Sequence, residues 1–353
     1  MRTRSIVMVL LAGSVACGRS PAPATNAAEE GSAPAVTQAQ LSMFAPLPAR
    51  MVAGEAPAEP MVALGRALYY ENILSENHDV SCNSCHPLNA YGADGRALSV
   101  GDRGQLGGRN APTVYNAAGH IAQFWDGRAK DVEAQAKGPI LNPAEMAMSD
   151  SAEVLAHLRA SPAYRAAFRE AFPGASQPVT YDNVGRAIGA FERGLVTPSR
   201  WDRYLTGDST ALDARERRGL ATFVAAGCVG CHNGAYVGGQ SYQKLGLRTA
   251  WSPTADSGRF AVTKSPADVR VFKVAALRNV EKTGPYFHDG SVASLRTAVQ
   301  LMAKHQLGRD LGDRDVDEIL AWLGALTGEL PTAYIAYPQK PAQPAPARPA
   351  AAN

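Results

Sequence analysis

Two cysteine pairs, each followed at once by a histidine, are the residues of this sequence best suited to chemistry. They occupy residues 82–86 and 228–232, and both read Cys-x-x-Cys-His. Two thiols at this spacing can bond to the two vinyl groups of one haem, while the adjacent imidazole reaches the iron. The residues expected to hold two haems are Cys82, Cys85 and His86 in the first motif and Cys228, Cys231 and His232 in the second.

Other uses of these cysteines are a disulfide or a zinc site. A structural zinc would require four protein ligands, and neither motif supplies them alone. The chain has five cysteines, and the fifth, Cys17, stands at the end of an N-terminal targeting segment. Four cysteines therefore remain for two haems, and none is left over for a disulfide between the motifs.

The composition predicts an exported globular protein. Hydrophobic residues make up 46% of the chain and charged residues 19%, and the net charge of +3 falls to +1 (3 − 2) without Arg2 and Arg4. A charge this small gives no reason to expect a nucleic-acid partner. Residues 1–16 predict a signal peptide, because Arg2 and Arg4 precede a short apolar run. Cleavage before Cys17 predicts a periplasmic protein, either lipidated at Cys17 or free of lipid.

The remaining chain predicts an all-α fold of two domains. An Ala/Pro-rich tether is expected over residues 17–59, helical domains over 60–205 and 206–330, and a disordered tail over 331–353. Apolar periodicity predicts helices near 61–68, 152–172, 184–195, 214–226 and 316–326, and short strands near 245–249 and 260–263. A helix followed by Cys-x-x-Cys-His occurs twice, as a weak internal repeat.

From about Leu64 to Gly328 the sequence resembles the bacterial di-haem cytochrome c peroxidases. The resemblance rests on short motifs that follow one another in order, at residues 109–113, 124–129, 138–139, 145–146, 190–193, 277–280 and 285–290. It implies two cytochrome-c-like helical domains, each with one covalently bound haem c. It also implies a homodimer that reduces hydrogen peroxide with electrons from a small cytochrome c or a copper protein (a cupredoxin).

The resemblance assigns different tasks to the two haems. It makes His86 the proximal ligand of the haem that reacts with peroxide, in the N-terminal domain. It makes His232 and Met302 the two ligands of the haem that collects electrons, in the C-terminal domain. A thioether opposite an imidazole raises the reduction potential, which suits a haem that collects electrons. Met at helical spacing is otherwise usually a packing residue.

Three further residues match the catalytic positions of the family. Glu145 and Gln135 correspond to the pair beside the reactive iron, where a carboxylate can move a proton and an amide can orient peroxide. Trp125 corresponds to the aromatic residue between the haems. Without the resemblance, these would be read as a solvated loop residue, a helix-surface residue and a core residue. A calcium ion is implied at positions that could otherwise be ordinary turns, Asn110, Thr283 and Pro285.

One position departs from the family pattern. Many members have a His seven residues before the position of Arg109, and this His blocks the reactive iron until the other haem is reduced. Asp102 stands there in this chain. We therefore expect a reactive haem that is open in the oxidised enzyme.

Two alternative functions remain at this stage. Di-haem enzymes that oxidise a protein substrate, as in maturation of methylamine dehydrogenase, share the Trp and Glu motifs but carry Tyr where Met302 stands. A plain electron-transfer cytochrome would need neither Glu145 nor Gln135, and would bind both irons with protein ligands on both sides.

Overall fold

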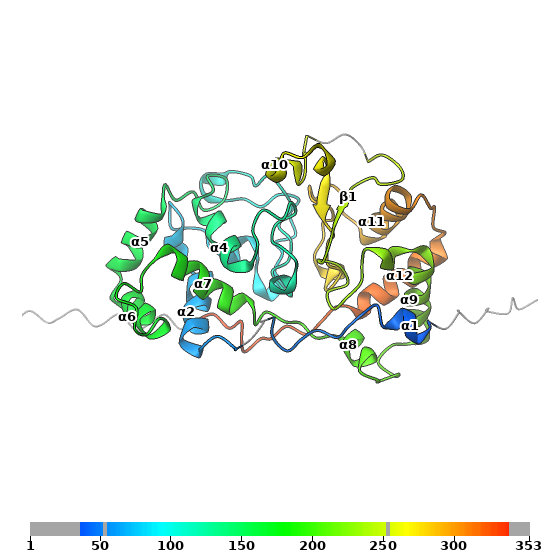
Figure 1. Cartoon of the computed structure of the whole chain (residues 1–353), viewed down its shortest axis with the longest axis horizontal. Coiled ribbons are helices and arrows are strands. Elements are labelled where there is room, and N and C mark those ends of the chain that lie inside the picture. Colours follow the sequence, from blue (N-terminus) through cyan, green and yellow to red (C-terminus); the bar gives the residue numbers. More distant parts are fainter. Residues whose placement is uncertain (1–35, 52–54, 252–254, 339–353) are drawn as a thin grey trace, which may run out of the picture. The chain divides into compact units, whose positions relative to one another are not determined.

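The structure, a computed structural model, describes residues 36–51, 55–251 and 255–338 and is mostly helical, as expected (Figure 1). The α-helices are α1 (Gln38–Leu41), α2 (Glu59–Tyr69), α3 (Cys82–Cys85), α4 (Val132–Leu141), α5 (Ser151–Ala160), α6 (Pro162–Ala171), α7 (Tyr181–Glu192), α8 (Arg200–Leu205), α9 (Ala214–Ala226), α10 (Phe260–Thr263), α11 (Leu295–Met302) and α12 (Asp313–Ala325). A π-helical turn, Ala303–Leu307, follows α11 directly. The predicted signal peptide and Cys17 lie outside the described residues.

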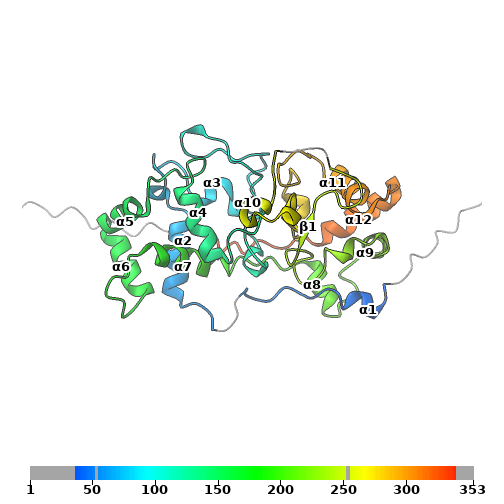
Figure 2. The same ribbon diagram turned by 45° about the horizontal axis from the view of Figure 1, so that its top comes forward.

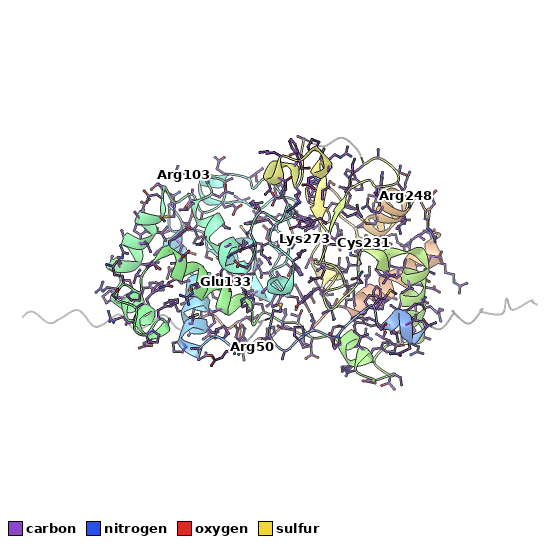
Figure 3. All side chains as sticks on the ribbon, in the orientation of Figure 1. Arg50, Arg103, Glu133, Cys231, Arg248 and Lys273 are labelled. Atoms are coloured by element: carbon purple, nitrogen blue, oxygen red, sulfur yellow. The ribbon has the colours of Figure 1, made fainter. Side chains whose placement is uncertain are left out.

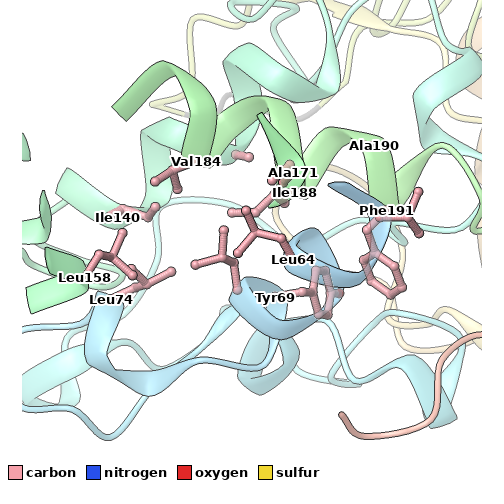
Figure 4. Packing of buried hydrophobic residues seen from close by; sticks show 14 of the residues in the cluster. Leu64, Tyr69, Leu74, Ile140, Leu158, Ala171, Val184, Ile188, Ala190 and Phe191 are labelled. Atoms are coloured by element: carbon pink, nitrogen blue, oxygen red, sulfur yellow. The ribbon is translucent and has the colours of Figure 1, made fainter. Parts of the chain in front are cut away.

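The first of two large hydrophobic clusters lies around the first haem motif. Helix α2, which precedes the motif, packs on α7, with Leu64 and Tyr69 facing Ile188 and Phe191 (Figure 4). The helices approach so closely that a Cβ on Gly65 would lie 1.8 Å from the carbonyl oxygen of Ala187. Only glycine permits this approach, which brings the end of α2 and the motif after it against the core.

The second cluster repeats this arrangement around the second motif. Helix α9 precedes the motif and packs on α12, with Phe223 and Trp322 centroids 4.6 Å apart. A Cβ on Gly219 of α9 would lie 1.9 Å from the carbonyl oxygen of Glu318 on α12. The weak repeat in the sequence therefore corresponds to a repeated helix pair with a glycine at the contact.

Parts of the expected tether and tail contact these two clusters. Phe44, from the predicted tether, is 6% exposed in the second cluster, and its ring meets Trp201 edge-on at 5.3 Å. The segment lies beside α8 and α9 in both views (Figures 1 and 2). Met51 is also buried, and Ile335, from the predicted tail, is buried in the first cluster. Nothing in the sequence indicated that these residues are buried, because each is a single large apolar residue in a segment rich in Ala and Pro.

Two local predictions were wrong. The strands are β1 (Tyr242–Lys244) and β2 (Val271–Lys273), which pair antiparallel, and residues 260–263 form α10 instead. Arg259 donates its backbone N–H to the carbonyl of Val271, so β2 contacts the start of this turn rather than a strand through it. The helix expected over 152–172 is divided into α5 and α6 at Pro162, because proline favours the first turn of a new helix.

Candidate functional site

The first haem motif is a single helical turn, α3, held at both ends. Ser81 and Ser84 form a capping box at its start. At its end, the Tyr69 hydroxyl donates to the carbonyl of His86 at 2.8 Å. The His86 ring donates through Nδ1 to the carbonyl of Gly92 at 3.1 Å. Burial lowers the pKa of His86, so the imidazole is neutral, with Nε2 left as the acceptor that an iron requires.

Glu145 lies beside this motif. It follows the end of α4, and the Asn142 amide donates to its Oε1 at 2.8 Å. Burial raises the pKa of Glu145, while Arg128 and Asn142 oppose that shift. The Glu145 charge in turn helps to raise the pKa of Cys82 and of Cys85, to which burial contributes most. The structure thus brings the predicted proton-transfer residue within electrostatic range of both cysteines.

Gln135 and Trp125 lie in different surroundings. Gln135 is half-buried on α4, and its side chain has no hydrogen bond to any residue in the described ranges. The Trp125 indole donates to the carbonyl of Asn110 at 2.9 Å, and its ring packs against the same small hydrophobic cluster as Met302. Trp125 therefore lines the cavity at the second motif.

A largely apolar cavity lies at the second motif. Its walls include both cysteines of the motif, His232 and Met302, which ends α11. Burial lowers the pKa of His232 to about 4, which keeps this imidazole neutral. None of the four motif cysteines forms a disulfide with another described residue. A cysteine pair, a neutral histidine and a thioether that line one cavity form the donor set expected for a haem c.

Two half-buried basic side chains in the cavity wall, missed in the sequence, support the assignment to haem. Lys273, at the end of β2, donates through Nζ to His120 Nδ1 at 3.2 Å. Burial lowers the pKa of Lys273 to about 8, and within the described ranges no carboxylate pairs with it. His120 Nε2 is a buried donor with no acceptor. An ammonium without a carboxylate partner and a ring N–H without an acceptor among the described residues suit the carboxylate groups that a haem carries.

Sequence alone could not have found this pair. His120 and Lys273 are 153 positions apart, and nothing in their local patterns links them. They meet because the backbone N–H of Lys273 donates to the carbonyl of Trp125 at 2.7 Å, which brings β2 against the segment that carries His120.

The three residues matched to calcium also line this cavity. Asn110 is 7% exposed, and its Nδ2 donates to the carbonyl of Arg96 at 2.9 Å, while no described residue donates a hydrogen bond to its Oδ1. Thr283 and Pro285 lie in one loop, which includes a cis Gly284–Pro285 peptide. Among the described residues, no cluster of three or more His, Cys, Asp or Glu side chains could hold a metal ion. Any cation here would depend on carbonyl and amide oxygens.

Asp102 is fully buried in the loop before Arg109. Its carboxylate accepts hydrogen bonds from the Asn77 backbone N–H at 2.8 Å and from Asn77 Nδ2 at 2.6 Å. Its own N–H donates to the carbonyl of Glu145 at 2.6 Å. The Asp102 carboxylate is thus hydrogen-bonded to Asn77. The Asp102 backbone N–H connects its loop to the segment that carries Glu145.

Known proteins are similar to this chain in sequence and in fold. The family described as di-haem cytochrome c peroxidase matches residues 59–210. The cytochrome c551 peroxidase of Pseudomonas aeruginosa is 46% identical over 308 residues, covering 85% of this chain and 88% of that relative. A cytochrome c551 peroxidase of Nitrosomonas europaea is also 46% identical, over 77% of this chain and 81% of that relative.

The chain belongs to the di-haem cytochrome c peroxidase family. A solved structure described as a MauG-like protein associated with microbial copper homeostasis has a TM-score of 0.72 and 31% identity, covering 83% of this chain and 95% of that one. The predicted fold and the predicted enzyme class, a haem-dependent cytochrome c peroxidase, are confirmed. No helix in the described ranges has the length and apolar character needed to cross a bilayer.

Proposed function

We propose that this peroxidase reduces hydrogen peroxide beside His86 and receives its electrons at the cavity around His232. The overall change is H2O2 + 2 e⁻ + 2 H⁺ → 2 H2O, with two donor molecules each oxidised by one electron. When bound, the haems supply the iron that takes up peroxide and the path for electrons. The chain's own residues must bind peroxide, move its proton and admit the donor.

The observation that carries this proposal is the half-buried Glu145 carboxyl near the first motif. Its Oε1 is held by Asn142, which leaves Oε2 to take a proton from one peroxide oxygen and return it to the departing one. A pKa raised by burial suits a group that must both accept and release a proton. We assign Gln135, on α4, the task of orienting peroxide through its amide.

At the other site, His232 and Met302 would hold the electron-collecting iron, and Trp125, which lines the same cavity, would assist electron transfer to the first motif. The donor is a small cytochrome c or a copper protein. The contact between the Trp125 carbonyl and Lys273 ties the indole to the cavity wall. That contact would hold an aromatic ring in a fixed place along the electron path.

Fully oxidised enzyme is expected to turn over peroxide at once, with no reducing pretreatment. The reason is that Asp102 stands where a blocking His is found in many relatives, and its carboxylate is hydrogen-bonded to Asn77. The measurement is stopped-flow oxidation of a reduced small cytochrome on mixing with oxidised enzyme and peroxide. A lag that pre-reduction abolishes would show that another residue blocks the iron.

Calcium at Asn110, Thr283 and Pro285 is expected to stabilise the folded enzyme. A ligand that binds only the folded state at one hundred times its Kd adds about 2.7 kcal/mol. Calorimetry of enzyme stripped with a chelator should show Tm rising on addition of Ca²⁺ and much less with Mg²⁺, which keeps its waters more tightly. Equal responses to both ions, or to neither, would contradict a calcium site.

We also propose that the enzyme is periplasmic, that Cys17 can carry a lipid, and that it assembles as a homodimer. The mass of the mature protein reports the lipid, and sedimentation of the purified enzyme reports the dimer.

A further inference from the structure

The two chain segments that meet at the second haem motif contain no acidic residue. The sequence has no Asp or Glu from Arg217 to Ala255, and none from Gly290 to Arg309. The mature protein is close to neutral overall, so this absence produces a local excess of positive charge.

The structure brings these two segments together at the outer wall of the cavity. Gln306, in the π-helical turn, accepts hydrogen bonds through Oε1 from the backbone N–H groups of Gly246 at 2.7 Å and Leu247 at 3.0 Å. The Arg248 backbone N–H donates to the carbonyl of His305 at 2.9 Å. Gln306 and Leu307 themselves line the cavity, together with Gly227. The loop over 244–249 and the π-helical turn therefore form one continuous surface beside the motif.

Four basic side chains lie on this surface, and we refer to them as the basic rim: Lys244, Arg248, Lys304 and Arg309. All four are exposed, and none forms an ion pair with any residue in the described ranges. Arg248 is on the loop near α11, and Cys231 of the motif is labelled in the same view (Figure 3). The Arg309 guanidinium donates to the carbonyl of Ala225, near the end of α9, at 3.2 Å, which places this charge just before the second motif.

An apolar residue stands among these charges. Leu247 is 50% exposed, between Lys244 and Arg248 in the sequence. Leu307, half-buried, lies 3.9 Å from the position of a Cβ on the exposed Gly227. Asp310, next to Arg309, is the nearest acidic neighbour in the sequence. An apolar contact within a ring of one charge is the usual composition of a surface for brief protein encounters.

We propose that the basic rim docks an electron-donor protein whose own contact face is acidic. This inference rests on the proposed function, in which the cavity around His232 receives electrons one at a time from a reduced donor. Opposite charges steer the encounter, and Leu247 supplies the apolar contact at its centre. A donor with a lysine-ringed face would be repelled. A lipid surface is a poorer match, because four charges around a single apolar residue form a small patch.

The test compares two probes that differ in charge alone. One is a mitochondrial-type cytochrome c with its lysine-rich face, and the other is the same protein after succinylation, which turns lysines into carboxylates. Calorimetric titration into the full haem-loaded enzyme should detect binding of the succinylated probe and much weaker binding of the native one. Added salt should weaken the succinylated complex, because exposed charges are screened within about 10 Å at 0.1 M.

Variants locate the surface. Lys244→Glu with Arg248→Glu should weaken binding of the succinylated probe by roughly tenfold or more, since like charges then face one another. Arg169→Glu, an exposed arginine on α6 in the other cluster, should leave binding unchanged. Peroxide turnover with a small neutral reductant should persist in the double variant, which separates failure of docking from failure of the peroxidase.

Tighter binding of the native, lysine-rich probe would overturn the proposal, as would a double variant that binds like the unaltered enzyme. Anionic lipid vesicles serve as the competing surface. Binding of the unaltered enzyme to these vesicles but not to the succinylated probe would also overturn it.

Discussion

Replacing Glu145 with glutamine is expected to lower kcat for peroxide by roughly 10²- to 10⁴-fold, the usual contribution of a positioned proton-transfer group. The amide keeps the size of the side chain and can still accept the hydrogen bond from Asn142 through its own Oε1. It cannot take up the proton that must pass between the peroxide oxygens. Steady-state turnover with a reduced small cytochrome measures the effect, and the visible spectrum confirms that both haems are loaded.

The dependence of peroxide turnover on pH tests the role of Glu145 independently. Burial raises the pKa of Glu145, so the carboxylate form is lost at a higher pH than for an ordinary glutamate. Activity that needs this carboxylate should fall as pH decreases through that raised pKa, and the fall should be missing from the residual activity of Glu145→Gln. Glu170→Gln, at an exposed position on α6, is the matched control. Glu145→Gln turning over at a rate close to that of the control would exclude Glu145 as the proton carrier.

Replacing Arg278 with methionine is expected to cost about 3–5 kcal/mol of folding free energy, because it leaves a buried charge without its partner. Arg278 is 1% exposed, and its guanidinium donates to both carboxylate oxygens of Asp202, at 2.7 and 2.9 Å. Asp202 also accepts the backbone N–H of Leu47 at 2.7 Å. Calorimetry should show Tm lowered by several degrees or more. Arg314→Met, at an exposed partner of Glu318, should change stability by less than about 1 kcal/mol.

The Arg278–Asp202 pair also determines how the free energy of unfolding changes at acid pH. Burial would raise the pKa of Asp202, but the Arg278 guanidinium outweighs it, and the pKa is held below its ordinary value. A depressed carboxyl pKa adds stability above the unfolded-state pKa of about 3.9, and this is lost as pH falls through the folded value. In Arg278→Met the loss of stability should begin at a higher pH. Equal acid midpoints for the variant and the unaltered protein would contradict this account.

The sequence was most informative where chemistry demands fixed spacing. Cys-x-x-Cys-His requires five adjacent residues, so both motifs could be read directly, and their order in the chain gave the two-site plan. The helices over 214–226 and 316–326 were also close to α9 and α12, because apolar periodicity on a core helix is strong. The motif matches singled out Glu145, Trp125 and Met302 as candidate site residues, which apolar periodicity could not have done.

Features that depend on distant contacts were not predictable. The Lys273–His120 pair and the Arg278–Asp202 pair each join segments far apart in the chain, and a lone Lys or Arg carries no local sign of a buried partner. The same holds for Phe44, whose burial depends on a site between Trp201 and Trp322. The strands β1 and β2 are three residues each, too short for an alternating pattern to be distinctive.

Each terminal segment of the described chain contacts the hydrophobic cluster of the other half. This limits where the enzyme could be split into separate single-haem domains. The N-terminal segment places Phe44 in the second cluster, and Met51 donates its N–H to the carbonyl of Arg193 at the end of α7 in the first. The C-terminal segment leaves α12 and buries Ile335 in the first cluster, where the Tyr334 hydroxyl donates to the carbonyl of Phe191. If the chain were cut between the motifs, the C-terminal half would lose the segment that carries Phe44. The N-terminal half would lose the segment that carries Ile335. A stable half with one haem would therefore need the missing terminal segment added back by fusion. Circular permutation should likewise be better tolerated than simple truncation.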